Sequence, residues 1–137
     1  MLLIALLLLA QPDPCSWLAP GASFAQPQRS TAVPAYSGQA PGTRCEYAGN
    51  GGSNVELIVY VDHSPAEAQV TFQKLSAFFP ATSKPSGIGD AAYFDQQHAI
   101  HVLKGKTRFY IRISSSDPGA TREKQARDFA TLIVAKL

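Results

Sequence analysis

Two neighbouring stretches, residues 43–48 and 55–62, alternate between polar and apolar positions. This period of two is typical of a strand with one buried face. In the second stretch Val55, Leu57, Val59 and Val61 fall on the same face. The glycine-rich segment 49–52 separates the two stretches, so we predict that they form an antiparallel hairpin.

Residues 90–95, 99–104 and 107–115 show the features of three further strands. If Gly105-Lys106 is a two-residue hairpin loop, Lys104 pairs with Thr107 and the apolar residues of both strands share one face. A shift of one residue would scatter these residues over both faces. The predicted shared face contains Ile100, Val102, Phe109, Ile111 and Ile113.

Two segments show helix-start signals followed by helical spacing of apolar residues. Ser64 and Pro65 suit the N-cap and first helical position, and Glu67 suits a capping box. Asp117-Pro118 resembles this start. The first buried stripe is expected to contain Ala68, Phe72, Leu75 and Phe79, and the second Ala126, Phe129, Ala130, Ile133, Val134 and Leu137.

The predicted element order is therefore ββαβββα. We expect an α+β domain over residues 43–137, with an antiparallel five-stranded sheet and both helices packed on one face. Residues 80–89 are expected to form a loop. Residues 11–42 are rich in proline and glycine, and we interpret them as an irregular arm held at both ends by a disulfide.

The first ten residues, MLLIALLLLA, form an uncharged apolar run. It is about half of the roughly 20 residues that a membrane-spanning helix needs, and it fits the apolar core of a secretory signal. The basic stretch that usually precedes such a core is missing, which a start further upstream would explain. A buried N-terminal helix is the alternative, but Pro12 and Pro14 would end it at once.

Composition places the chain among ordinary single-domain globular proteins. Its 137 residues are 45% hydrophobic and 16% charged, with 12 lysines and arginines against 10 acidic residues, a net charge of +2. Nucleic-acid binding normally requires a concentrated basic face, so this balance argues against a nucleic-acid partner. We also expect no transmembrane span in the mature chain.

Export makes the pair Cys15 and Cys45 informative, because disulfides persist outside the cytoplasm. A bridge closing a loop of about 30 residues would stabilise the fold by roughly 3–4 kcal/mol. Two alternatives are a lipid anchor at Cys15, where Pro14 is a poor preceding residue, and a cysteine nucleophile, for which no basic partner is evident. We expect the structural bridge.

Four short segments, in this order, resemble an uncharacterised family of small secreted proteins and lipoproteins of bacterial envelopes. The resemblance implies a disulfide between the two cysteines and an envelope location, and it implies no catalytic residue. The chain departs from the family at WLAPG, residues 17–21, where related proteins continue into a Leu-Leu-Thr turn and a helix. The segments are Asp13-Pro14-Cys15-Ser16, Arg44-Cys45-Glu46-Tyr47, Gly87-Ile88-Gly89-Asp90-Ala91-Ala92-Tyr93 and Val102-Leu103-Lys104-Gly105.

Residues that could carry chemistry do not form a recognisable motif. His98 and His101 are three apart, which places them on opposite faces of one strand, whereas metal ligands must converge on one point. We therefore expect exposed histidines near turns and no metal or cofactor, even with Asp62, His63 and Asp95 nearby. No serine lies in a G-x-S-x-G elbow, so no catalytic residue is assigned.

The glycine-rich segments have structural interpretations. Segment 49–52 joins two antiparallel strands, whereas a phosphate cradle requires a strand followed by a helix N-terminus. In Gly87-Ile88-Gly89-Asp90, the glycines supply positive φ angles and Asp90 can bond the turn backbone. We predict turns at both places.

The predicted register gathers polar and aromatic side chains on the sheet face away from the helices. Such a face offers guanidinium groups and aromatic platforms to an acidic or planar partner. Cross-strand packing of a solvated surface is the structural alternative. The candidate binding residues are Arg108, Tyr110, Arg112, His101 and Tyr60, with Ile58 and Leu103 beside them.

The sequence thus favours a non-catalytic extracytoplasmic module that binds an envelope protein or a small ligand. One alternative is a small secreted enzyme whose polar groups converge only in three dimensions. Another is a ligand pocket between helices and sheet, lined by Phe72, Phe79 and Phe129.

Overall fold

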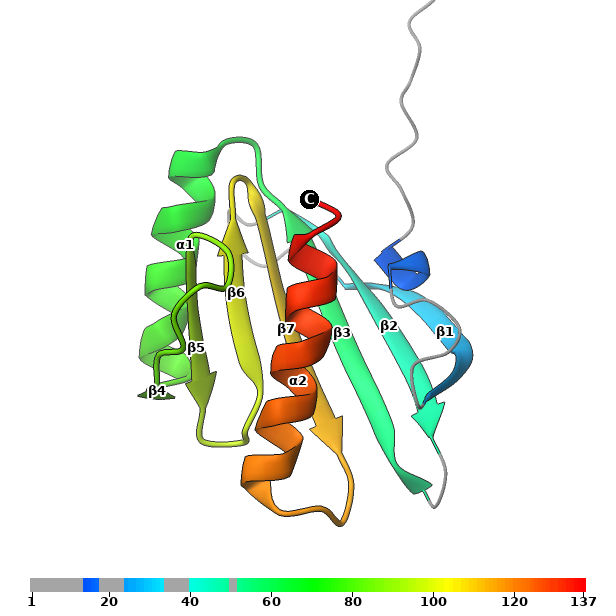
Figure 1. Cartoon of the computed structure of the whole chain (residues 1–137). Coiled ribbons are helices and arrows are strands. Elements are labelled where there is room, and N and C mark those ends of the chain that lie inside the picture. The colour runs from blue at the N-terminus through cyan, green and yellow to red at the C-terminus, as the bar shows by residue number, and fades with distance from the viewer. Residues whose placement is uncertain (1–13, 18–23, 34–39, 50–51) are drawn as a thin grey trace, which may run out of the picture.

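The computed structural model of the chain describes residues 14–17, 24–33, 40–49 and 52–137. Within these residues seven strands form one antiparallel sheet in the order β1-β2-β3-β7-β6-β5-β4 (Figure 1). The sheet and its two helices confirm the α+β class. The elements are η1 (Pro14–Ser16), β1 (Phe24–Val33), β2 (Gly42–Gly49), β3 (Asn54–Val61), α1 (Pro65–Phe78), β4 (Ala81–Ser83), β5 (Ala91–Asp95), β6 (Ile100–Lys104), β7 (Thr107–Ser114) and α2 (Gly119–Val134).

The register predicted from the Gly105-Lys106 turn is confirmed. Lys104 pairs with Thr107, and the next pairs of the same ladder follow without a shift. The predicted β2–β3 hairpin is also present, and β3 pairs with β7, so the two hairpins join into one sheet. The further pairs of the β6–β7 ladder include Val102 with Phe109 and Ile100 with Ile111.

The prediction of five strands is wrong, because two segments expected to be irregular are strands. Part of the arm forms β1, which pairs antiparallel with β2 through two register shifts on either side of Pro27. Part of the loop 80–89 forms β4, a three-residue strand that pairs with the end of β5. Both strands lie at the edges of the sheet, where pairing on one side is sufficient.

Helix α2 covers one face of the sheet and closes the hydrophobic core. Its residues Ala126, Phe129, Ala130 and Ile133 are buried, as predicted, whereas Leu137 is exposed. They join side chains that alternate along the central strands and point to the same face. This core face contains Val55, Leu57, Val59, Ala92, Phe94, Ile100, Val102, Phe109, Ile111 and Ile113.

The prediction that both helices pack on one face is also wrong. The ring of Phe72 on α1 meets the ring of Tyr93 edge-on at 5.4 Å between centroids, and Phe79 lies 5.6 Å from His101. Tyr93 and His101 alternate with core residues along their strands, so they point to the opposite face. Figure 1 accordingly shows α2 in front of the sheet and α1 beside β5.

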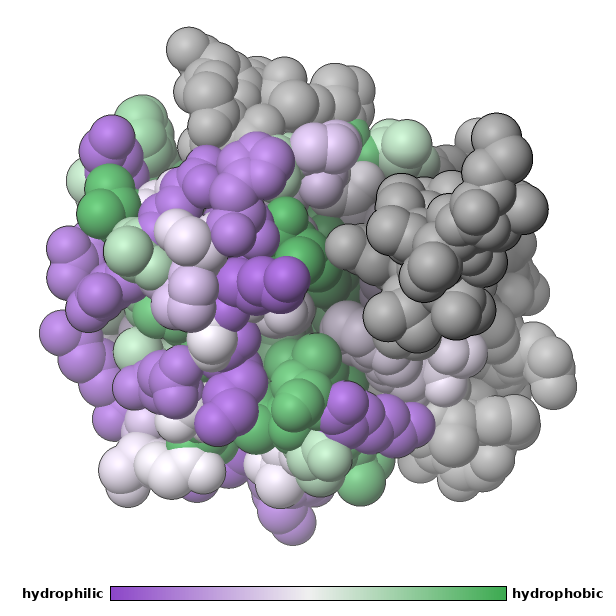
Figure 2. Space-filling view, turned by 90° about the horizontal axis from the view of Figure 1, so that it is seen from above, coloured by the Kyte–Doolittle hydropathy of each residue, from purple (hydrophilic) through white to green (hydrophobic). Residues whose placement is uncertain are grey.

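The placement of α1 rules out the predicted pocket lined by Phe72, Phe79 and Phe129, since Phe129 belongs to the core on the other face. Helix α1 is also less buried than α2. Only Ala68 of α1 is fully buried, and Val70 and Phe78 are exposed. Viewed from above, Figure 2 shows hydrophobic residues among hydrophilic ones on the side where α1 lies.

The start of α1 is confirmed and the start of α2 is corrected. The Ser64 hydroxyl accepts a hydrogen bond from the Glu67 backbone N–H at 3.1 Å, with Pro65 at the first helical position. In contrast, Pro118 is the N-cap of α2, and no side chain caps it. Asp117 stays in the preceding loop, where its N–H donates to the Ser115 hydroxyl.

A disulfide joins Cys15 of η1 to Cys45 of β2, with their Cα atoms 5.4 Å apart. The Tyr47 hydroxyl donates to the Cys15 carbonyl, and the Lys136 ammonium donates to the Trp17 carbonyl, so η1 is tied both to the sheet and to the C-terminus. The apolar run 1–10 lies outside the described residues. Among those described, no helix is both long and apolar enough to span a membrane.

Candidate functional site

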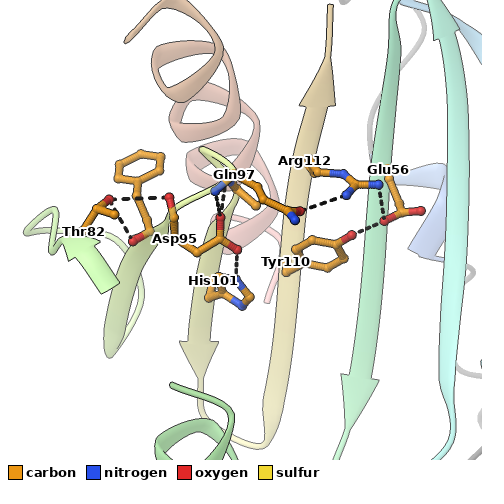
Figure 3. A network of polar contacts seen from close by, with 9 residues as sticks. Glu56, Thr82, Asp95, Gln97, His101, Tyr110 and Arg112 are labelled. Atoms are coloured by element: carbon orange, nitrogen blue, oxygen red, sulfur yellow. Dashed lines mark hydrogen bonds and ion pairs between the residues drawn. The ribbon is translucent and has the colours of Figure 1, made fainter. Parts of the chain in front are cut away.

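The sheet surface opposite α2 carries a connected set of polar and aromatic side chains from β3, β5, β6 and β7 (Figure 3), and Arg44 of β2 adjoins it. We call it the polar face. Helix α1 covers this surface at β5 and β6, through contacts with Tyr93 and His101. The polar face is defined by Arg44, Glu56, Asp95, Gln97, His101, Tyr110 and Arg112.

At the α1 side of the polar face, His101 and Asp95 form a buried pair. The His101 Nε2 atom lies 2.7 Å from Asp95 Oδ2. The imidazole stacks on the Tyr93 ring at 4.5 Å and contacts the Tyr110 ring at 5.4 Å. The pair is therefore enclosed by aromatic rings, with Phe79 of α1 on one side.

Hydrogen bonds keep Asp95 ionised in spite of its burial. Burial alone would raise the pKa of this carboxyl, but the hydrogen bond from His101 and the backbone N–H groups of Gln97 and Ala99 lower it below its ordinary value. Oδ1 accepts both backbone bonds, at 2.8 and 3.2 Å. Asp95 thus organises the β5–β6 turn and fixes the His101 ring at the same time.

At the other side of the polar face, Glu56 collects three partners. The Tyr110 hydroxyl donates to Oε1, Arg112 Nη2 lies 3.7 Å from the same oxygen, and Arg44 Nε lies 3.5 Å from Oε2. Burial, followed by the hydrogen bond to Glu56, raises the pKa of Tyr110, so this hydroxyl stays protonated. Arg112 also donates to the Gln97 side chain at 3.0 Å and so joins the two halves of the polar face.

Arg44 and Arg112 remain available to a partner. Their side chains are 39% and 38% exposed. The Nε atom of each is buried, so a partner can reach only the other atoms of these side chains. Each guanidinium still has terminal N–H donors that its contacts with Glu56 and Gln97 leave unused.

The structure separates Arg108 from the other candidate residues. Its guanidinium is buried and binds Asp62 through two hydrogen bonds, at 2.5 and 3.2 Å. The Tyr60 ring lies 4.6 Å below the guanidinium carbon. Arg108 and Tyr60 thus pack against each other, whereas His101, Tyr110 and Arg112 belong to the network around Asp95 and Glu56.

Sequence reasoning left Arg44, Glu56, Asp95 and Gln97 out of the candidate site. A usable signal existed for two of them, because the alternation of β2 and β3 puts Arg44 and Glu56 on the same face as Tyr60. Gln97 lies in a turn, and its contact with Arg112 depends on the turn geometry.

The histidines do not converge. His98 Nδ1 lies 3.1 Å from Glu123 of α2, on the core side of the sheet, whereas His101 faces α1. Over the residues the structure covers, no group of three or more potential ligands could hold a metal ion. The expectation that the histidines are exposed is wrong for His101, which its stacking partners and Asp95 bury.

The glycine turn before β5 has the predicted conformation, with positive φ at Gly87 and Gly89. The Asp90 carboxylate accepts a hydrogen bond from the Gly105 N–H at 2.7 Å. Asp90 therefore joins its own turn to the β6–β7 hairpin, which supports the structural interpretation.

Fold and site together define the chain as an α+β protein with a seven-stranded antiparallel sheet in its described part, one helix on each face and a charged aromatic surface. Comparison with protein-family models, with curated proteins and with solved structures found no match.

Proposed function

We propose that the chain is a non-catalytic binding module of the cell envelope, and that the arginines of the polar face bind acidic groups of a partner. The observation that carries the proposal is the arrangement of Arg44 and Arg112. Both flank Glu56, and their side chains are 39% and 38% exposed, so part of each can be reached by a partner. Guanidinium groups with free donors bind carboxylates in a directed, bidentate geometry.

The geometry of the polar face suits binding because its side chains are held in place. The Tyr110 hydroxyl donates to Glu56, which is a partner of Arg112, and the Gln97 side chain accepts a hydrogen bond from Arg112 itself. The guanidinium of Arg112 is therefore positioned before a ligand arrives. Preorganisation lowers the entropy lost on binding. The charges in this part of the polar face also favour an acidic partner, because two arginines surround one glutamate.

The buried His101–Asp95 pair is the strongest feature in favour of the alternative, a small enzyme. A histidine–aspartate pair activates a nucleophile in hydrolases only when a hydroxyl or thiol is within hydrogen-bond reach of the histidine. Among the described residues, the one hydrogen bond shown for His101 is to Asp95. The pair is also enclosed by Tyr93, Tyr110 and Phe79, so these contacts favour a structural role.

Export is part of the proposal. It is supported by the Cys15–Cys45 disulfide, which forms readily outside the cytoplasm, and by the apolar run 1–10. Expression of the full chain in a bacterium, followed by fractionation and thiol alkylation, tests this point. We expect the chain in the envelope or medium with both cysteines blocked. A cytoplasmic chain with two reactive thiols would contradict export.

The binding proposal is tested with the double variant Arg44→Gln/Arg112→Gln. The immobilised chain is exposed to envelope extracts, and the amount of each captured protein is measured by quantitative mass spectrometry. We expect a partner that binds the native chain and is lost from the double variant. Capture should also weaken as salt rises, because the contacts are between exposed charges.

A matched control removes the same charge elsewhere. Lys124→Gln/Arg127→Gln changes two exposed cations of α2 and should leave capture unchanged. Equal capture by all three proteins would overturn the assignment of the polar face. Arg108 is left intact in both variants, since it is buried with Asp62 and its loss would affect folding.

A further inference from the structure

A groove lies between helix α1 and strands β4, β5 and β6. Two adjoining cavities, of about 460 and 300 Å³, share the lining residues Phe72, Gln73 and Ala91. Cavities of 300–1,000 Å³ that are mainly apolar with a few polar groups are typical of small-ligand sites. The groove lies apart from Arg44 and Arg112, so its role does not depend on the function proposed above.

The two ends of the groove differ in chemistry. The larger cavity is lined mainly by apolar groups, among them Pro65, Ala66 and Leu103. Its one charged residue, Asp90, is already engaged by the Gly105 N–H and by Lys104. The smaller cavity contains Lys84, for which no partner is shown among the described residues. The groove is therefore apolar at one end and cationic at the other.

Tyr93 adds a specific polar feature at the cationic end. It lines the smaller cavity, and its hydroxyl oxygen is buried without a hydrogen-bond partner in the described part of the chain. Burial, with a smaller contribution from Asp95, raises the pKa of Tyr93 to about 12, so the hydroxyl keeps its proton. A buried donor without an acceptor is unfavourable, and an acceptor that enters the groove would relieve this cost.

We propose that this groove binds a free single-chain carboxylate, such as a medium-chain fatty acid. The carboxylate lies near Lys84 and accepts a hydrogen bond from the Tyr93 hydroxyl, while the acyl chain runs past Phe72 and Ala91 toward Leu103. The chemistry of the groove selects this occupant, because Lys84 and Tyr93 both line the smaller cavity and the mainly apolar larger cavity adjoins it.

The test is isothermal titration calorimetry of the full chain with dodecanoate, kept below its micelle concentration. We expect saturable one-to-one binding. Dodecyltrimethylammonium, which has the same chain with a cationic head, should not bind. Tyr93→Phe should weaken dodecanoate binding by about tenfold, the usual effect of losing a hydrogen bond to a charged group. Lys84→Gln should weaken it by up to about fivefold.

Ala91→Leu fills the groove where the two cavities meet, at a residue that is exposed, and should abolish binding. The matched control is Ala135→Leu, an exposed alanine at the C-terminal end of α2 that lines neither cavity, which should bind as the native chain does. Thermal melting checks that each variant folds.

Four outcomes would overturn the proposal. The first is dodecanoate binding that is undetectable at millimolar concentration. The second is unchanged binding in Ala91→Leu, which would assign the binding to another part of the chain such as the apolar run 1–10. Equal binding of the cationic amphiphile would show that the head group is not recognised. Binding to phosphatidylglycerol vesicles in place of dodecanoate would point to a membrane surface.

Discussion

The Nε2 atom of His101 lies 2.7 Å from the Oδ2 atom of Asp95, and this pair joins strand β6 to the end of strand β5 under a cover of aromatic rings. Asp95 binds the turn backbone with its other oxygen. One carboxylate therefore fixes both a side chain of the polar face and the hairpin that carries it.

Asp95 should make stability depend on pH in the acidic range. Its pKa is lower in the folded chain than in the unfolded chain, so ionised Asp95 stabilises the fold above the unfolded value, about 3.9. This contribution is lost as pH falls through the folded pKa. We expect Asp95→Asn to lower the free energy of unfolding at pH 7 by about 1–3 kcal/mol. The difference should shrink below pH 4, as measured by urea unfolding. Parallel acid profiles for the two proteins would contradict this role.

Arg108 and Arg112 should differ sharply in their effect on stability. Arg108→Met leaves Asp62 as a buried charge without its partner, and breaking such a pair costs about 3–5 kcal/mol. Arg112→Gln removes a partly exposed contact with Glu56 and should cost no more than about 1 kcal/mol. Urea unfolding of both variants checks the contrast. Similar losses for both would mean that the Asp62 pair is not buried in solution.

The disulfide should be a main source of stability for the N-terminal part of the sheet. It closes a loop across a sequence separation of 30. Replacing both cysteines by alanine should lower the free energy of unfolding by about 3–4 kcal/mol. Native chain treated with dithiothreitol should show the same loss, and dithiothreitol should not affect the variant. Unchanged stability in the double variant would show that η1 is held by other contacts.

Gly89 and Gly87 provide a matched pair. Both have positive φ, 60° and 78°, which strains any other residue by about 1 kcal/mol. A Cβ atom at Gly89 would lie 2.6 Å from the Leu103 carbonyl oxygen, whereas at Gly87 nothing lies within 4 Å. Gly89→Ala should therefore destabilise the fold clearly more than Gly87→Ala. Equal melting temperatures would show that the turn before β5 can move away from β6.

The sequence was sufficient to predict those parts of the fold that local signals define. Ser64 and Pro65 set the start of α1, and the two-residue turn at Gly105 set the register of β6 with β7. Strands β1 and β4 were not predicted, because neither has the regular alternation of a longer strand. Strand β1 contains Pro27 between two register shifts, which interrupts the alternation, and β4 has only three residues.

The sheet face to which α1 packs could not be predicted from its apolar stripe. The stripe shows which side of a helix is buried but does not show which face of the sheet it meets. Strands β5 and β6 are buried on both faces, with Phe94 and Val102 on one and Tyr93 and Leu103 on the other, so either placement satisfied the pattern. The pairing of Arg108 with Asp62 spans 46 residues and had no local signal.

The placement of the two helices determines which strands can unfold locally and which unfold only with the whole domain. Since α2 packs over one face of β6 and α1 over the other, this strand is shielded from water on both sides, and its residues from Ile100 to Leu103 are all buried. Amide hydrogens of β6 should consequently exchange with deuterated solvent only through global unfolding, whereas those of β4 should exchange through local fraying. In the described part of the chain, β6 is thus a strand of five residues that can stay closed while the edges of the sheet fluctuate.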